Sequence, residues 1–163
     1  MTQIHEAERV NSTINKMVHC AKIIGLPIIA NTQYKKGLGP YVTSLEELMA
    51  DVPRPDKTEF NALANPETEK LVDNLATEIH TAILVGVETH ICIYQTAMGL
   101  LEKGITPWIV ADGVSSRSKY NSELGLTRLQ ALGAAVGPAE MIIYELLARA
   151  GTDIFKAVLP HII

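Results

Sequence analysis

A single cysteine, Cys92, stands where an apolar run changes into a helical pattern, in the stretch VGVETHICIY at residues 85–94. The start of a helix offers unpaired N–H groups and the positive end of the helix dipole, which favour a thiolate. The same N–H groups could bind the oxyanion that forms when sulfur attacks a carbonyl carbon. The pattern therefore indicates either a nucleophile or, because free cysteine packs like a small hydrophobic residue, a core position.

Further polar residues follow other apolar runs of the chain. Gln33 and Tyr34 come after the run PIIANT at residues 27–32, and Arg117 comes after the run at residues 106–111 and the loop that follows it. We expect Gln33 and Tyr34 to line a small-molecule pocket. Arg117 could bind a carboxylate of the ligand, or it could pair with an acid of the protein and connect two loops.

The composition describes an ordinary chain with one domain over residues 1–163 and excludes several functional classes. It has a formal net charge of −4, with 47% hydrophobic and 20% charged residues, so we expect no nucleic-acid partner, which would need a basic surface. Cys20 and Cys92 lie far apart, and the histidines show no zinc-type spacing, so we expect no metal and no cofactor. Without a leader pattern or a membrane-length apolar run, we expect a cytoplasmic protein that does not bind membranes.

The elements that would position these residues alternate between helices and strands. The period of the apolar residues and the glycine and proline positions predict helices over residues 4–24, 66–76, 92–103, 120–132 and 140–150, with a helical turn at 44–49. Strands are predicted over residues 27–32, 82–87, 106–111 and 134–136. Nearly continuous apolar strands between helices indicate a three-layer α/β/α fold with a mainly parallel, Rossmann-like sheet. In such sheets ligands bind at the carboxyl ends of the strands, which is where Cys92, Gln33 and Arg117 are expected.

Several motifs in the same order resemble the isochorismatase-like hydrolase superfamily, and most closely its isochorismatase domain-containing branch. The motifs are TQYKKGLGP at 32–40, DKTEF at 56–60, VGVETHICIYQTA at 85–97, LLEKGI at 100–105, VADGVSSRS at 110–118 and FKAVL at 155–159. Cysteine hydrolases of this family use an Asp at the end of the first strand, a Lys after the third, and a Cys at the helix after the fourth.

The resemblance implies that Cys92 is the nucleophile and that Lys57 is the family lysine, whose ammonium group would favour the thiolate. It also implies a non-proline cis peptide bond between Val87 and Glu88, with the N–H groups of Glu88 and Cys92 as oxyanion donors. Proton transfer is assigned to the family Asp, so we expect His90 to be structural.

The sequence departs from the family pattern at its start. The resemblance implies an apolar strand ending in Asp before the helix that opens at Ile4, and residues 1–3 contain no such strand. We therefore expect the central strand and its general base to be missing; Asp51, Asp56 and Asp112 do not match the position of that base. The true protein could be longer, the chain could be a degenerate member, or a neighbouring subunit could fill the gap.

The resemblance and this departure together lead to two alternative functions. Residues 31–40 contain no histidine, unlike the metal-binding run of the nicotinamidase branch, which indicates a metal-free hydrolase. We expect a cysteine hydrolase that acts on a small amide or a related acyl compound, impaired if the Asp is absent, and that assembles as a homo-oligomer. The alternative is a non-catalytic member of the fold that binds a small molecule or a protein.

Overall fold

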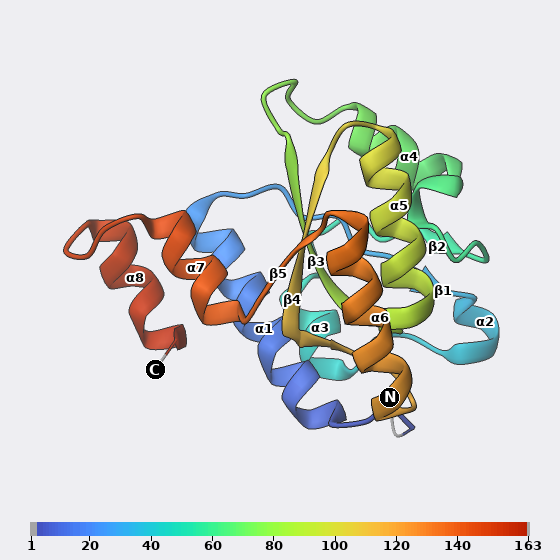
Figure 1. Ribbon diagram of the computed structural model, residues 1–163. Coiled ribbons are helices and arrows are strands. Elements are labelled where there is room, and N and C mark those ends of the chain that lie inside the picture. The colour runs from blue at the N-terminus through green and yellow to red at the C-terminus, as the bar shows by residue number, and fades with distance from the viewer. Residues whose placement is uncertain (1–2, 163) are drawn as a thin grey trace.

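The computed structural model describes residues 3–162 and has the α/β architecture predicted from the sequence (Figure 1). The strands are β1 (Thr32–Gln33), β2 (Asp56–Lys57), β3 (Thr81–Val87), β4 (Thr106–Ser115) and β5 (Ala135–Gly137). The α-helices are α1 (Ala7–Ile24), α2 (Lys35–Leu38), α3 (Thr43–Leu48), α4 (Pro66–Asp73), α5 (Tyr94–Glu102), α6 (Lys119–Leu132), α7 (Ala139–Leu147) and α8 (Asp153–Ile162). A 3₁₀ turn, η1 (Ala62–Ala64), and a π-helical turn, η2 (Thr89–Ile93), complete the elements.

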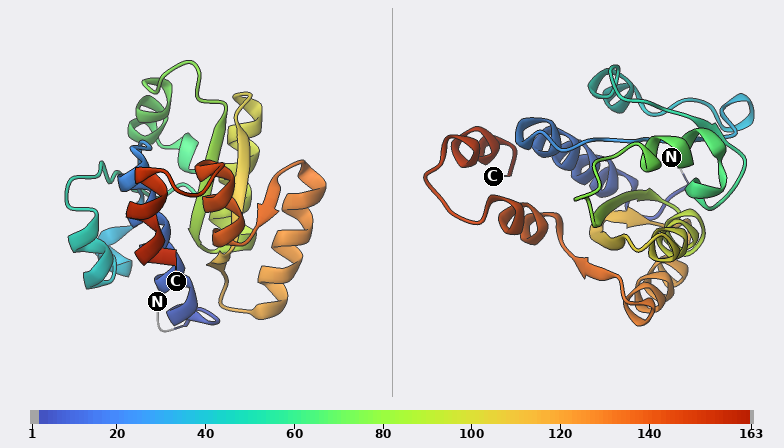
Figure 2. Two further views of the ribbon diagram at one scale, coloured as in Figure 1. Left: turned by 90° about the vertical axis from the view of Figure 1, so that its left-hand side faces the viewer. Right: turned by 90° about the horizontal axis from the view of Figure 1, so that it is seen from above.

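The larger sheet has the strand order β3-β4-β5, and all of its strands are parallel. Helices cover both of its faces, with α1 on one side and α5 and α6 on the other (Figure 2). Side chains of β4 alternate between these layers, as the two-residue period of a strand requires. Trp108 and Val110 pack with α1 and α7, whereas Ile109 packs with α5 and α6. The sheet and its two helix layers therefore form the predicted three-layer core.

The smaller sheet contains only β1 and β2, which also run parallel. The predicted strand at residues 27–32 is wrong in its bounds, because regular pairing begins only at Thr32. The amide of Ala30 does donate to the Pro53 carbonyl, at 3.1 Å. In a parallel ladder the return bond would come from residue 55, and Pro55 has no N–H to donate. The proline therefore delays the regular strand by two residues.

The two sheets share no hydrogen bonds in the described part of the chain, where β3 pairs with β4 alone and β1 with β2 alone. A cavity of about 590 Å³ lies between residues 26–29 and β3, and its walls are mostly apolar side chains of α1, α4 and β3. This cavity lies where the sequence predicts a gap between the strands. The absence of the family's first strand stays a prediction.

Several predicted boundaries are corrected by the structure. α1 starts at Ala7 and not at Ile4, because Glu6 has left-handed backbone angles, with φ at 52°. The helical path around Cys92 begins at Thr89, as a π turn, instead of at Cys92. β4 continues to Ser115, so Asp112 lies within the strand and not at its end. α8 was not predicted, and among the described residues no helix is both long and apolar enough to span a membrane.

Tyr41 fastens the loop between α2 and α3 to the segment that leads into β1, since its hydroxyl donates to the main-chain oxygen of Asn31. Burial raises the pKa of Tyr41 to about 12, so the folded protein favours the neutral phenol. The resulting stabilisation is present below about pH 10, the usual pKa of tyrosine, and is lost as the pH rises toward about 12. We predict that Tyr41→Phe lowers the free energy of unfolding by about 1 kcal/mol at pH 8.

Between pH 10 and 12 the Tyr41→Phe variant should lose less additional stability than the wild type, because phenylalanine does not ionise. Urea denaturation of both proteins at pH 8, 10 and 11.5 measures the difference. Parallel loss of stability in the two proteins would show that Tyr41 does not contribute to the alkaline transition.

Candidate functional site

Cys92 lies in η2, directly after β3, and its side chain is partly buried. The peptide bond between Val87 and Glu88 is cis, which is the isomer that the resemblance implies. Gly86 precedes this bond with φ at 123°, a backbone conformation that a residue with a side chain rarely adopts. Cys20, in contrast, is 1% exposed in the core, and burial raises the pKa of its thiol. The chain therefore presents one accessible thiol and one inert thiol.

Gln33 lies beside Lys57 because β1 and β2 pair in a register that places the two residues opposite each other. The Lys57 side chain is buried, and its ammonium group donates to Oε1 of Gln33 and, at 2.8 Å, to the carbonyl of Glu59. The same Gln33 oxygen lies 4.0 Å from Sγ of Cys92 and accepts the thiol hydrogen. The structure thus brings together three of the predicted residues, with an amide oxygen between the cation and the sulfur.

Tyr34 and Arg117, the other predicted substrate contacts, are both exposed. The Tyr34 ring covers the α-carbon of Gly37 and is 51% exposed. The Arg117 guanidinium donates to Oε1 of Glu88 at 3.1 Å, and its main-chain N–H donates to Oε2 of Glu88 at 2.8 Å. Arg117 therefore connects the end of β4 to the turn after β3, which is the tethering geometry that the sequence left open. A role of either residue in substrate binding stays a prediction.

The acidic residues weighed as substitute bases have other partners. Asp51 pairs with Lys22 on the surface. Asp56 accepts from the hydroxyl of Thr32 at 2.8 Å and from the main-chain N–H of Lys35. Oδ1 of Asp112 accepts from the N–H of Ala139 at 2.7 Å. Across residues 3–162, no carboxylate forms a hydrogen bond with Cys92 or Lys57.

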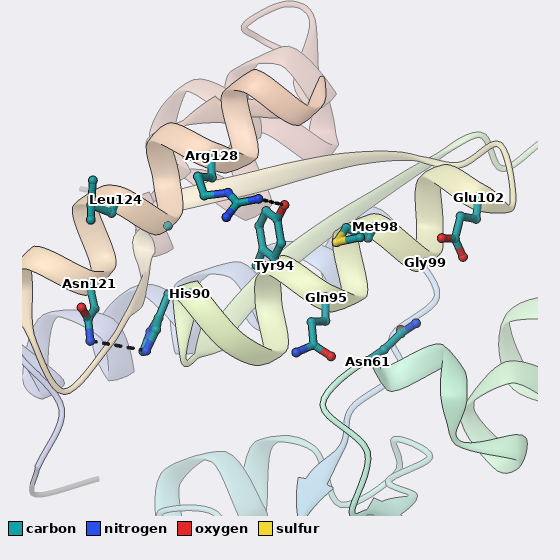
Figure 3. A pocket seen from close by; sticks show the side chains of 11 residues that line it. Asn61, His90, Tyr94, Gln95, Met98, Gly99, Glu102, Asn121, Leu124 and Arg128 are labelled. Atoms are coloured by element: carbon teal, nitrogen blue, oxygen red, sulfur yellow. Dashed lines mark hydrogen bonds between the residues drawn. The ribbon is translucent and has the colours of Figure 1, made fainter.

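Helix α6 packs against the turn that carries Cys92, at Thr89 and His90. The hydroxyls of Thr89 and Ser122 form a buried hydrogen bond of 3.1 Å. Nδ1 of His90 lies 2.9 Å from the Ser116 hydroxyl, and its Nε2 lies 3.4 Å from the Asn121 amide, which Figure 3 shows. These contacts agree with a structural role for His90. Ser116 and Ser122 are not among the predicted site residues, although Ser116 lies within the motif VADGVSSRS at 110–118. For Ser122, a small residue within a predicted helix was the only available signal.

A second cavity of about 620 Å³ opens on the far side of this turn, between α5 and α6 (Figure 3). His90 and Tyr94 line it together with Arg128, which donates to the Tyr94 hydroxyl at 2.9 Å. Cys92 and Lys57 do not line it. No cluster of three or more possible metal ligands occurs in the part of the chain that the structure describes.

Comparison with known proteins gives consistent matches. A family model described as "Isochorismatase domain" matches residues 1–141. The secreted isochorismatase effector Isc1 of Phytophthora sojae is 35% identical over 147 residues, which are 88% of this chain and 70% of that protein. The isochorismatase domain-containing protein 2 of Xenopus laevis is also 35% identical over 147 residues, with 90% of this chain and 70% of that protein covered.

Solved structures share the fold. A structure described as the MAR1 ribonuclease of Caenorhabditis elegans superimposes with a TM-score of 0.91 at 33% identity, covering 99% of this chain and 82% of that one. The Escherichia coli YcaC gene product, described as an octameric hydrolase of unknown specificity, has a TM-score of 0.86 at 23% identity, covering 98% of this chain and 82% of that one. The second match supports the fold alone.

Gly125 of α6 allows the helix to approach the Cys92 turn closely, and this contact can be tested by substitution. A Cβ at residue 125 would lie 3.1 Å from the main-chain N and Cα of His90, which cannot move without shifting the turn. We predict that Gly125→Ala lowers the free energy of unfolding by about 1–2 kcal/mol, despite the better helix propensity of alanine. Urea denaturation provides the measurement.

Gly99→Ala is the matched control, because Gly99 also lies within a helix and its added Cβ would meet only the side-chain amide of Asn61, at 2.6 Å. That amide can turn away by releasing the hydrogen bond that its Oδ1 accepts from the Leu63 N–H at 2.9 Å. The better helix propensity of alanine should largely offset this loss, so the control should lose less stability than Gly125→Ala. Equal losses in both variants would show that the contact between α6 and the turn is not the limiting one.

Proposed function

The chain belongs to the isochorismatase domain family, and from this membership we propose that it is a metal-free cysteine hydrolase that cleaves the C–N bond of a small amide or a related acyl compound. The observation that carries the proposal is the cluster of Cys92, Gln33 and Lys57, in which a partly buried thiol and a buried ammonium group share one amide oxygen. A cation close to a thiol favours the nucleophilic thiolate.

In the proposed reaction, Sγ of Cys92 attacks the carbonyl carbon of the substrate. The N–H groups of Glu88 and Cys92 bind the oxyanion, and the Lys57 ammonium stabilises the developing negative charge. The C–N bond breaks, the amine leaves with the proton that the thiol has lost, and the acyl group remains on sulfur as a thioester. Water then hydrolyses the thioester, which releases the acid and restores the thiol proton.

A second candidate function is supported by one specific observation. Among residues 3–162, no carboxylate contacts the thiol, and Asp51, Asp56 and Asp112 are bonded elsewhere. A member of the fold without a general base would bind a small molecule or a protein without turning it over.

We also propose a compartment, an assembly and a domain organisation for the protein. We place the protein in the cytoplasm, where the two free cysteines would stay reduced, although the relative from Phytophthora sojae is named as secreted. We also propose a homo-oligomer of single-domain subunits, since the YcaC gene product of the same fold is described as octameric. Size-exclusion chromatography with light scattering would detect such an assembly.

The proposed hydrolase makes a direct prediction about the two thiols. Iodoacetamide at pH 7 should modify Cys92 at least about tenfold faster than Cys20, because Cys20 is buried and its pKa is raised. Peptide mass spectrometry measures both rates. In a panel of primary amides, ammonia release should occur with the wild type and be abolished in Cys92→Ala.

Cys20→Ala serves as the control for this experiment and should retain the ammonia release of the wild type. If both thiols react equally slowly and no amide of the panel is hydrolysed, the binding function is supported instead. Ligand-dependent protection of Cys92 from iodoacetamide, without turnover, would then identify what the site binds.

A further inference from the structure

Gln33 has a fixed orientation between Lys57 and Cys92. Its side-chain NH₂ donates to the carbonyl of Thr58 at 2.9 Å, and a carbonyl accepts hydrogen bonds only. The amide oxygen must therefore point the other way, where it accepts from the Lys57 ammonium and from the Cys92 thiol. One neutral oxygen thus accepts from two donors, an ammonium group and a thiol that loses its proton in the proposed reaction.

The acceptors around the Lys57 ammonium are neutral. An ammonium group has three N–H donors. One donates to the oxygen of Gln33, and a second donates to the carbonyl of Glu59, with 2.8 Å between the nitrogen and the oxygen. Among the described residues Lys57 forms no salt bridge. Main-chain hydrogen bonds and, to a smaller extent, the charge of Lys57 lower the pKa of the nearby Glu59 carboxyl group. The Lys57 ammonium and the Cys92 thiol share the Gln33 oxygen, so a thiolate at Cys92 would be attracted by the same cation.

The other charged or titratable groups near the site have their own partners. Glu88 binds Arg117, and the Glu59 carboxylate accepts from the N–H of Thr58. Asp56 accepts from Thr32 and Lys35, and His90 bonds to Ser116. Among these groups, Lys57 alone shares a hydrogen-bond acceptor with Cys92.

The hydrogen bond from the thiol to Gln33 exists only while the sulfur carries its proton. A thiolate has no hydrogen to donate, and it would face an oxygen that competes with it for the same ammonium group. We propose that Gln33 is a positioning residue that holds Cys92 as a neutral thiol and shares the Lys57 ammonium with it, which keeps the thiolate fraction low in the empty site.

This role differs from the substrate contact that the sequence predicts for Gln33. The proposed effect of Gln33 on catalysis rests on the proposed function. Its effect on thiolate formation does not, because thiolate formation can be measured without any turnover. A substrate that binds the amide oxygen of Gln33 would free the ammonium group for the sulfur, so the site would become nucleophilic when it is occupied.

The test is the pH profile of Cys92 alkylation by iodoacetamide in the full chain, followed at the Cys92 peptide by mass spectrometry. Gln33→Met keeps the length of the side chain and removes the oxygen. We expect the rate at pH 7 to rise about three- to tenfold, the size of one neutral hydrogen bond, with the midpoint of the profile at lower pH. Lys57→Met should move the midpoint in the opposite direction.

At high pH every Cys92 is a thiolate, so the plateau of the alkylation rate reports how easily iodoacetamide reaches the sulfur. The midpoint of the profile reports how easily the thiol loses its proton. An equal plateau with a shifted midpoint supports the proposal, whereas a changed plateau with an unchanged midpoint would mean only that Gln33→Met opens the site, and would overturn it. Gln130→Met, at an exposed position of α6, is the matched control and should reproduce the wild-type profile.

Gln33→Glu provides a second variant if Gln33→Met does not fold. A carboxylate would bind Lys57 more strongly than an amide does and would repel the thiolate, so alkylation at pH 7 should become slower. Faster alkylation of Gln33→Glu, an unchanged profile of Gln33→Met, or slowing of Gln33→Met as in Lys57→Met would each overturn the proposal. A lack of amide hydrolysis in all proteins would count against the proposed hydrolase without affecting these outcomes.

Discussion

The burial of one ammonium group constrains the site more than any other interaction in the structure. Lys57 is 6% exposed, and a buried charge is tolerated only where hydrogen bonds replace the lost water. The oxygens of Gln33 and Glu59 provide these bonds. Gln33 can do so only because the parallel register of β1 and β2 places it opposite Lys57. Two strands of two residues each therefore determine where the positive charge of the site lies.

The site also depends on how the two sheets are held together. Lys57 and Gln33 come from the small sheet, whereas Cys92 follows β3 of the large one, and no hydrogen bonds join these sheets in the described residues. The connection is apolar packing under α1. Val10, Ile14 and Val18 of this helix form one core cluster with Leu45 and Met49 of the α3 region. Ile28 and Ala30, from the segment that leads into β1, and Val85 and Val87 of β3 pack against this cluster. The distance between the sulfur and the ammonium group is thus set by a hydrophobic core and not by a β-ladder.

The turn that carries Cys92 is supported from two directions. At its start, Glu88 accepts from both the main-chain N–H and the guanidinium of Arg117, which attaches the turn to the end of β4. On the side of α6, Ser122 and Gly125 bring that helix into contact with Thr89 and His90 of the turn. The nucleophile that we propose for Cys92 would need such support, because small displacements of a nucleophile reduce its effectiveness strongly. The α5–α6 cavity shares His90 with this support, so it adjoins the turn without containing the sulfur.

Much of this arrangement follows from the sequence alone. The apolar period predicts a helix over residues 4–24, which forms as α1 from Ala7 onward, and the run at 82–87 predicts β3, because these patterns depend on neighbours close in the chain. The position of Cys92 after a strand could likewise be inferred from the sequence, and the family motifs led to the prediction of Lys57 as a site residue. The late start of β1 was readable in principle from Pro55, but only once its partner strand was known.

The tertiary structure alone decided which side chains meet. Gln33 was expected to contact a substrate, and its position between Lys57 and Cys92 depends on the register of β1 with β2 and on the packing of α1. Arg117 could have bound a ligand or an acid, and the fold brought it to Glu88. Periodicity records what each residue does within its own element. Contacts between elements depend on registers and packing that residues distant in the sequence establish together, and no local pattern contains them.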